Sequence, residues 1–229
     1  MNLSPVYHDR LKIFQEEVTL YPVSCEKLAR GRSDTEWLEA VLEAGVRIVQ
    51  LRDKTSDDRT LYKKAKIFRQ KTREKGALLI INNRLDIALL AEADGVHLGN
   101  SDIPAQEARK LAPQLIIGVS ANTAEQAASA EKRGASYYNI GPLFPTDTKR
   151  GLHQFIGLEA IRKYSALSGL PFTVMGGIKF GHIPALIEQG ARRIAVVTAL
   201  TLADEIREET SRWLREIEKQ WKLTAGSQE

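Results

Sequence analysis

Cysteine is nearly absent from this chain, and its scarcity excludes two kinds of site. A single residue, Cys25, cannot form an intrachain disulfide or a multi-cysteine metal centre. Long apolar runs are missing as well, since none approaches the roughly 18 residues that would span a membrane. The N-terminal residues lack the basic-then-apolar order of a signal peptide. These absences predict a cytoplasmic protein with no membrane partner.

The chain also lacks a strong excess of either positive or negative charge. The chain has 33 Lys and Arg against 29 Asp and Glu, a net charge of +4, and the two signs are mixed along the sequence. It has no dense basic tract interleaved with aromatic residues, which is the usual footprint of nucleic-acid binding. We therefore expect no nucleic-acid partner. Small anionic substrates remain compatible with the mild positive excess.

The sequence does contain a regular alternation of short apolar runs and amphipathic segments. Eight runs are predicted to be strands, at 18–24, 46–51, 77–81, 95–98, 115–119, 137–140, 172–175 and 194–197. Helical periodicity covers 34–44, 57–74, 85–91, 105–111, 124–133, 158–165, 183–189 and 202–223. This alternation predicts an α/β protein with a parallel sheet and helices outside it. Eight repeats in 229 residues favour a closed (β/α)8 TIM barrel over an open sheet.

Nothing in the composition divides the chain into parts. We find no linker or low-complexity tract, so a single barrel domain is predicted over residues 1–229, with a core at about 18–221. Residues 1–16 read as a leading N-terminal helix or arm, and 225–229 as a frayed tail. Trp213 and Trp221 on the last helix are expected to be exposed, where they would serve a homodimer or cap the barrel.

One loop combines several groups that bind oxyanions. After the predicted strand 137–140, residues 141–151 read Gly-Pro-Leu-Phe-Pro-Thr-Asp-Thr-Lys-Arg-Gly. The hydroxyls of Thr146 and Thr148, the Lys149 ammonium and backbone N–H groups suit a ligand with several acceptor oxygens. The loop therefore predicts a phosphate or pyrophosphate site, and the alternative is a polar surface loop.

Polar residues and glycines also end the other predicted strands, at the face where barrels of this type carry their function. They are Gln50, Arg52, Lys54, Asn82, Asn83, His97, Asp102, Ser120, Gly176, Gly177 and Thr198, together with the apolar Val197 that precedes Thr198.

Each of these signals has a plainer alternative. Arg52 and Lys54 would also suit a solvated pair at a helix entry, and Gly176–Gly177 an ordinary turn. Asp102 would also suit a helix N-cap before Pro104. Asn82 and Asn83 would equally start the helix at 85–91. His97 is interpreted as a satisfied interior histidine and not as a base, because no acid neighbours it in sequence.

The motifs together resemble the thiamine phosphate synthase family, in order and at the family's spacing. They are Gln50–Lys54, Asn82–Arg84, Asp94–Gly99 with Asp102, Gly118–Ser120, Gly141–Lys149, Gly176–Ile178 and Val197–Ala199. The resemblance covers roughly residues 18–205. It implies a (β/α)8 transferase that joins 4-amino-5-hydroxymethyl-2-methylpyrimidine diphosphate to thiazole phosphate, releases pyrophosphate and uses Mg²⁺.

The resemblance also assigns roles by position. Gln50, Arg52, Lys54, Asn82 and Lys149 would hold the pyrimidine diphosphate, Ser120 would meet the pyrimidine and diphosphate, and Asp102 would ligate Mg²⁺. Thr146, Thr148, Gly177, Val197 and Thr198 would line the thiazole phosphate pocket. Arg52, Lys54, Ser120 and Lys149 are the catalytic candidates. Because an electron-rich pyrimidine methylene stabilises a cation, such an enzyme mainly binds the leaving charge and positions the attacking nitrogen.

Three positions depart from the family pattern. Asn83 stands where the family usually has an aspartate that ligates Mg²⁺, and a neutral amide oxygen is a poorer ligand than a carboxylate. We therefore expect weaker metal binding, with Asp102 and the diphosphate as the main ligands. Asn100 replaces a common glutamine, and Asn122 replaces a histidine that many members carry.

Two alternative functions follow from these departures. A thiazole tautomerase would keep the phosphate pocket without the coupling reaction, but that subgroup tends to use a histidine near 120–123, where this chain has none. A non-catalytic barrel that binds phosphorylated ligands is the other alternative.

Overall fold

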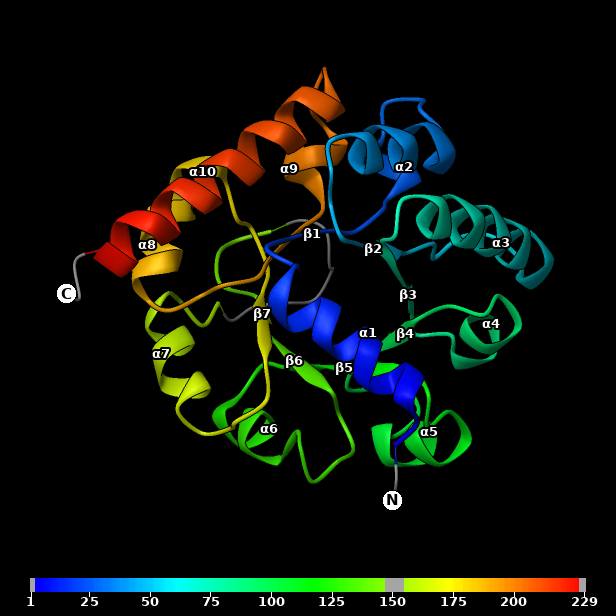
Figure 1. Ribbon diagram of the computed structural model, residues 1–229, viewed down its shortest axis with the longest axis horizontal. Helices are drawn as coiled ribbons and strands as arrows, with labels where there is room; N and C mark the ends of the chain where they lie inside the picture. The colour runs from blue at the N-terminus through cyan, green and yellow to red at the C-terminus, as the bar shows by residue number, and fades with distance from the viewer. Residues whose placement is uncertain (1–2, 147–154, 227–229) are drawn as a thin grey trace.

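The computed structural model describes residues 3–146 and 155–226, in which eight parallel strands form one sheet. Helices surround this sheet (Figure 1). This confirms the predicted (β/α)8 fold. The strands are β1 (Leu20–Pro22), β2 (Ile48–Leu51), β3 (Leu78–Asn82), β4 (Gly95–Leu98), β5 (Ile116–Ala121), β6 (Tyr137–Ile140), β7 (Phe172–Val174) and β8 (Ile194–Val196).

Neighbouring strands pair in the order β1-β8-β7-β6-β5-β4-β3-β2. The remaining gap between β1 and β2 is bridged by a parallel pairing of Val23 with Gln50. There the Ser24 N–H donates to the Gln50 carbonyl at 2.9 Å. The ring of strands is thus closed at its carboxyl-terminal edge.

Helices follow the strands as the alternation predicts. They are α1 (Pro5–Glu16), α2 (Asp34–Glu43), α3 (Asp58–Glu74), α4 (Leu85–Leu90), α5 (Ala105–Leu111), α6 (Ala124–Ser129), α7 (Glu159–Ser165), α8 (Ile183–Glu188), α9 (Thr198–Thr201) and α10 (Ile206–Gly226), with 3₁₀ turns η1 (Glu26–Leu28) and η2 (Phe180–His182). Hydrogen bonds between neighbouring residues define where two of these helices begin. Ser33 and Glu36 form a capping box at the N-terminus of α2, and Thr123 and Gln126 form one at the N-terminus of α6.

Alternating side chains divide the strands between two cores. Val49 and Leu51 of β2 point outward into the large core beneath the helices, whereas Ile48 points into the barrel. The inward positions become polar toward the carboxyl-terminal end, since Gln50 follows Ile48 on β2 and Asn82 follows Ile80 on β3. The barrel therefore has an apolar floor and a polar mouth.

Helix α1 lies across the amino-terminal end of the barrel (Figure 1). Its buried Tyr7 and Phe14 join the interior cluster with Ile116 and Tyr137, which begin their strands. Arg10 anchors the helix by an ion pair with Asp94 at 3.0 Å. The predicted N-terminal helix is confirmed, and it seals the end of the barrel opposite the polar mouth.

Several predicted boundaries are wrong. Strand 18–24 shortens to β1, helix 124–133 ends at Ser129, and the helix predicted at 202–223 begins only at Ile206, as α10. The predicted tail at 225–229 is also wrong in part, because α10 continues through Gly226; residues 227–229 lie outside the described part.

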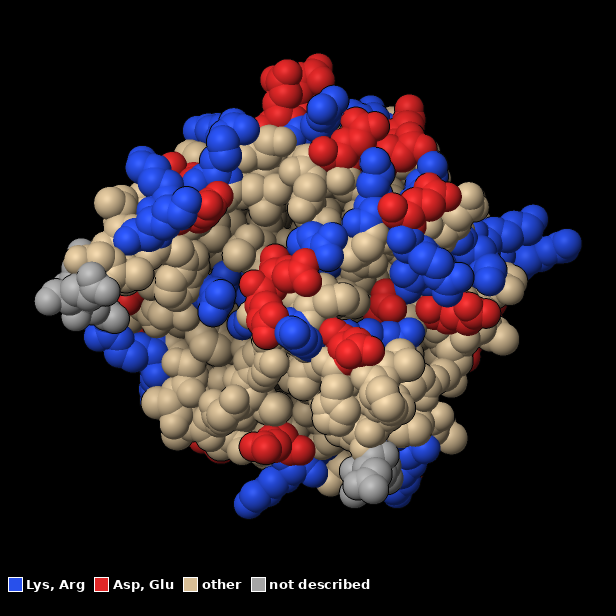
Figure 2. Space-filling model, in the orientation of Figure 1, with Lys and Arg blue, Asp and Glu red and all other residues tan. Residues whose placement is uncertain are grey.

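Trp213 is not exposed as predicted, because it is 1% accessible and packs into the outer core. Trp221 is partly buried against the same core. Basic and acidic side chains interleave on the face that α1 covers (Figure 2), as the mixed sequence predicts. None of the helices in residues 3–146 and 155–226 combines the length and apolar composition of a membrane span.

Candidate active site

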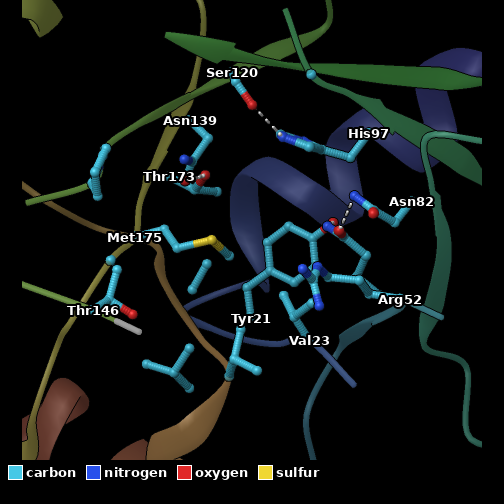
Figure 3. A pocket seen from close by; sticks show the side chains of 18 of the residues that line it. Tyr21, Val23, Arg52, Asn82, His97, Ser120, Asn139, Thr146, Thr173 and Met175 are labelled. Atoms are coloured by element: carbon cyan, nitrogen blue, oxygen red, sulfur yellow. Dashed lines mark hydrogen bonds between the residues drawn. The ribbon is translucent and has the colours of Figure 1, made fainter. Parts of the chain in front are cut away.

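A cavity of about 530 Å³ opens at the carboxyl-terminal ends of the strands. Ten of the predicted site residues line it, namely Gln50, Arg52, Lys54, Asn82, Asn83, Ser120, Thr146, Gly177, Val197 and Thr198. Figure 3 shows Arg52, Asn82 and His97 on one side of the cavity, with Thr146 and Met175 on the other. Residues far apart in the chain therefore meet around one space, as the barrel geometry predicts.

Thr148 and Lys149, together with Arg150 of the same predicted loop, lie outside the described residues. Asp102 is described but does not line the cavity; it lies behind Asn83, which does.

The Arg52 guanidinium has few partners in the cavity wall. Its Nη1 lies 3.9 Å from Cys25 Sγ, a weak acceptor, and its backbone N–H donates to Ser24 Oγ at 3.0 Å. Within residues 3–146 and 155–226 it forms no ion pair. A half-buried guanidinium has up to five N–H donors, so Arg52 offers most of its hydrogen-bonding capacity to a ligand in the cavity.

Asp53, between Arg52 and Lys54, is structural. It accepts from Lys64 Nζ at 2.7 Å and from the Thr55 N–H at 2.9 Å. Burial alone would raise the pKa of Asp53, but hydrogen bonds from Lys64, Ser56 and Thr55 outweigh burial and lower it. The ion pair with Lys64 fixes the segment that carries both cations.

Lys64 also contacts Glu26 and Asp34, so three carboxylates surround one ammonium. Among the described residues, these three are the only group of at least three His, Cys, Asp or Glu side chains whose ligand atoms lie close enough together to share a metal ion. Burial raises the pKa of Asp34, against the lowering effect of Lys64. Because Lys64 already supplies the positive charge, we interpret the group as a structural ion-pair cluster.

Asn83 and Asp102 pair with each other at the end of β3 and β4. Asn83 Nδ2 donates to Asp102 Oδ1 at 2.8 Å, and the Gly99 N–H donates to Asp102 Oδ2 at 2.6 Å. Asn83 has a φ of +66°, a left-handed conformation that Asn and Asp tolerate best. The amide thus stands where a second carboxylate would face Asp102.

Two plainer alternatives for these residues are wrong. Helix α5 takes Pro104 and not Asp102 as its N-cap, without a side-chain hydrogen bond. Arg84, and not Asn82 or Asn83, occupies the N-cap of α4. The interpretation of His97 as a satisfied interior histidine is confirmed, since Nδ1 lies 3.2 Å from Tyr137 Oη and Nε2 lies 3.3 Å from Ser120 Oγ inside the barrel.

The loop after β6 is hydrogen-bonded to the glycines after β7. Leu143 N–H donates to the Met175 carbonyl and Phe144 N–H to the Gly176 carbonyl, both at 3.0 Å. Gly177 has a φ of +62°, and a Cβ there would lie 2.8 Å from the Phe144 carbonyl oxygen. Glycine is therefore required because two loops pack backbone to backbone, which places Thr146 beside Gly177 at the cavity.

Asn122 joins the ends of three strands. Its Nδ2 donates to the Gly141 carbonyl, its Oδ1 accepts from Asn100 Nδ2 at 2.7 Å, and its N–H donates to Gln126. The two departures Asn100 and Asn122 thus pair with each other at the rim of the cavity.

Sequence reasoning missed part of the cavity wall, namely Tyr21, Asn139, Thr173 and Met175. Thr173 Oγ1 donates to Asn139 Oδ1 at 2.8 Å, so these two polar groups satisfy each other. The alternation of side chains along a strand could have identified Asn139 and Thr173, because both occupy inward positions, on β6 and β7 respectively.

A (β/α)8 barrel with cations, hydroxyls and close-packed glycines at its carboxyl-terminal mouth is an enzyme scaffold for phosphorylated small molecules. Residues 20–200 match the family described as thiamine monophosphate synthase. The thiamine-phosphate synthase of Caldicellulosiruptor bescii is 40% identical over 199 residues, which cover 86% of this chain and 90% of the relative. That of Dictyoglomus thermophilum is 38% identical over 211 residues, 92% of this chain and 94% of the relative.

A solved structure agrees. The thiamine phosphate pyrophosphorylase of Pyrococcus furiosus has a TM-score of 0.84 and 35% identity, and the match covers 90% of this chain and 98% of that one. The chain belongs to the thiamine monophosphate synthase family, and is an enzyme of the transferase class. This confirms the resemblance seen in the sequence.

Proposed function

We propose that this chain couples 4-amino-5-hydroxymethyl-2-methylpyrimidine diphosphate to thiazole phosphate and releases pyrophosphate. The observation that carries the proposal is the position of Arg52, a half-buried guanidinium at the cavity wall that no described carboxylate neutralises. A cation held in this way favours a polyanion over a neutral ligand. The identity of the two substrates is what the resemblance to this family implies.

The proposed roles follow the side of the cavity on which each residue lies. Arg52, Lys54, Gln50 and Asn82 bind the diphosphate; Arg52 and Lys54 stabilise the charge that builds on it as the bond to the pyrimidine methylene breaks. Ser120 orients the pyrimidine end. Thr146, Gly177, Val197 and Thr198 bind the thiazole phosphate across the cavity, so that its ring nitrogen faces the methylene carbon. Lys149 and Thr148 are proposed to complete these two groups.

Mg²⁺ is proposed as the cofactor, and the residues present fit it. Mg²⁺ in proteins commonly takes one or two carboxylates together with substrate phosphates. Asp102 supplies one carboxylate, and Asn83 beside it supplies an amide. Bound there, the ion would neutralise charge on the departing pyrophosphate.

The decisive experiment measures pyrophosphate release and thiamine phosphate formation by the purified protein with both substrates and a titration of Mg²⁺. Product that requires both substrates and the metal would support the proposal. Binding of thiazole phosphate without product at saturating Mg²⁺ would contradict it and favour the tautomerase or the non-catalytic barrel. Asn122, engaged with Asn100 and Gly141, offers no proton shuttle for the tautomerase.

Replacing Asn83 tests the metal assignment. In Asn83→Asp a second carboxylate would face Asp102, so we expect the Mg²⁺ concentration for half-maximal rate to fall about tenfold. In the presence of a chelator, repulsion between the two carboxylates should lower the melting temperature, and Mg²⁺ should restore it. Asn100→Asp is the matched control, since Asn100 contacts Asn122 and not Asp102. Equal Mg²⁺ requirements in Asn83→Asp and the wild type would show that position 83 does not meet the metal.

A further inference from the structure

A continuous chain of side-chain hydrogen bonds crosses the interior of the barrel at the base of the cavity. It joins six residues from six strands, in the order Asn82, Gln50, Tyr21, Tyr137, His97 and Ser120. The heavy-atom distances run from 2.9 to 3.3 Å. Figure 3 shows its last link, between His97 and Ser120.

The first two links set a direction. Asn82 Nδ2 donates to Gln50 Oε1 at 3.0 Å, and Gln50 Nε2 donates to Tyr21 Oη at 2.9 Å. Tyr21 Oη therefore already accepts one hydrogen bond, and its own proton needs an acceptor. The partner that the structure provides is Tyr137 Oη at 3.0 Å.

Both phenols keep their protons, so each must donate. Burial raises the pKa of Tyr21, against the lowering effect of its hydrogen bonds, and burial raises that of Tyr137 further, with Tyr21 adding to it. Because Tyr21 donates to Tyr137, the proton of Tyr137 goes on to His97 Nδ1. A bare Nδ1 in a neutral imidazole places the ring proton on Nε2, which then donates to Ser120 Oγ.

We infer that Tyr137 is a positioning residue, which holds His97 as the Nε2–H tautomer and thereby leaves the Ser120 hydroxyl proton to be donated into the cavity. Tyr137 does not line the cavity, whereas Ser120 does. The inference rests on the proposed function only in one respect, which is that the pyrimidine diphosphate is taken as the acceptor of the hydrogen bond that the Ser120 hydroxyl donates.

Gly118 supports this interpretation. It lies between Tyr137 and His97, and a Cβ at position 118 would be 2.6 Å from His97 Nδ1 and closer still to the Tyr137 ring. The hydroxyl and the imidazole can therefore meet only because the strand between them carries no side chain at this position.

The first test is ¹⁵N NMR of the histidine side chains in the ligand-free protein, with His97→Gln to assign the His97 signals. We expect a neutral imidazole with the proton on Nε2. A proton on Nδ1 would reverse the direction of the chain and overturn the inference. This measurement needs no turnover, so it stands whether or not the protein is a synthase.

The second test is a double-mutant cycle. Tyr137→Phe removes the hydroxyl that donates to His97 and should lower kcat/KM for the pyrimidine substrate about tenfold, the scale of one hydrogen bond. The NMR spectrum of this variant should show a mixture of the two tautomers. In the Ser120→Ala background the same change should have almost no further effect on kcat/KM, because Tyr137 acts through Ser120.

Tyr138→Phe is the matched control. Tyr138 is the next residue of β6, and its buried hydroxyl donates to the Tyr164 carbonyl at 3.4 Å on the outer side of the barrel. It should leave the His97 tautomer unchanged. Additive losses from Tyr137→Phe and Ser120→Ala would contradict the inference. If Tyr137→Phe fails to fold, the His97 tautomer measured in the wild-type protein alone supports or overturns the inference.

Discussion

Replacing Arg52 by glutamine is expected to lower kcat/KM by about 10² to 10³, the usual loss when a donor to developing negative charge is removed. Glutamine retains one donor group but loses the charge and the fork of N–H groups. Most of the loss should appear in kcat, because charge on the departing diphosphate is largest in the transition state. Steady-state kinetics with the pyrimidine diphosphate varied would measure it.

The melting temperature of Arg52→Gln should stay close to that of the wild type. The described residues provide Arg52 with no carboxylate whose pairing would be lost, and Asp53 keeps its own bond to Lys64. The matched control is Arg59→Gln, which makes the same chemical change on the exposed side of α3. If both variants lost activity equally, the effect would come from net charge and not from the position of Arg52.

Arg52 also shows what a sequence can predict about such a site. Gln50 and Arg52 are two residues apart at the end of an extended run, so the period of two and the barrel rule are enough to place them together. The same reasoning brought Asn82, Ser120, Gly177 and Thr198 to one cavity. The alternation of side chains within a strand and the order of the strands along the chain are both visible in the sequence, and for this reason these residues could be predicted to meet.

Contacts between distant segments could not be predicted in this way. Tyr21 and Tyr137 belong to apolar runs, and their hydroxyls acquire a role only when the barrel brings them 3.0 Å apart. Trp213 has the spacing of an amphipathic helix whose buried face depends on its neighbours, and it turned out to be inside. From the sequence alone, Asp102 suits a helix N-cap and a metal ligand equally well, and only the structure shows its hydrogen bond with Asn83.

Gly177 illustrates both what the sequence predicts and what it does not. Its position at the cavity was predicted, but the reason why a glycine is required there was not. The sequence suggests that glycine admits a phosphate; the structure adds that it admits the backbone of the loop after β6. A Cβ at position 177 would be 2.8 Å from the Phe144 carbonyl oxygen and closer to that of Pro145. These are backbone atoms, so the loop would have to move, and with it Thr146.

We therefore expect Gly177→Ala to raise KM for thiazole phosphate strongly and to lower kcat/KM by about 10² or more. The reason is that displacement of a binding group by about 1 Å can cost that much. The φ of +62° adds backbone strain of about 1–2 kcal/mol, which should lower the melting temperature by several degrees. Kinetics with each substrate varied in turn would separate the two ligand sites.

The matched control is Gly181→Ala, four residues further along the chain. Gly181 is exposed, and a Cβ there would meet nothing within 4 Å. It should retain full activity. If Gly177→Ala raised KM for the pyrimidine diphosphate instead, the assignment of the phosphate pocket to this side of the cavity would be wrong. An unchanged KM for both substrates would mean that the two loops can separate without disturbing either ligand.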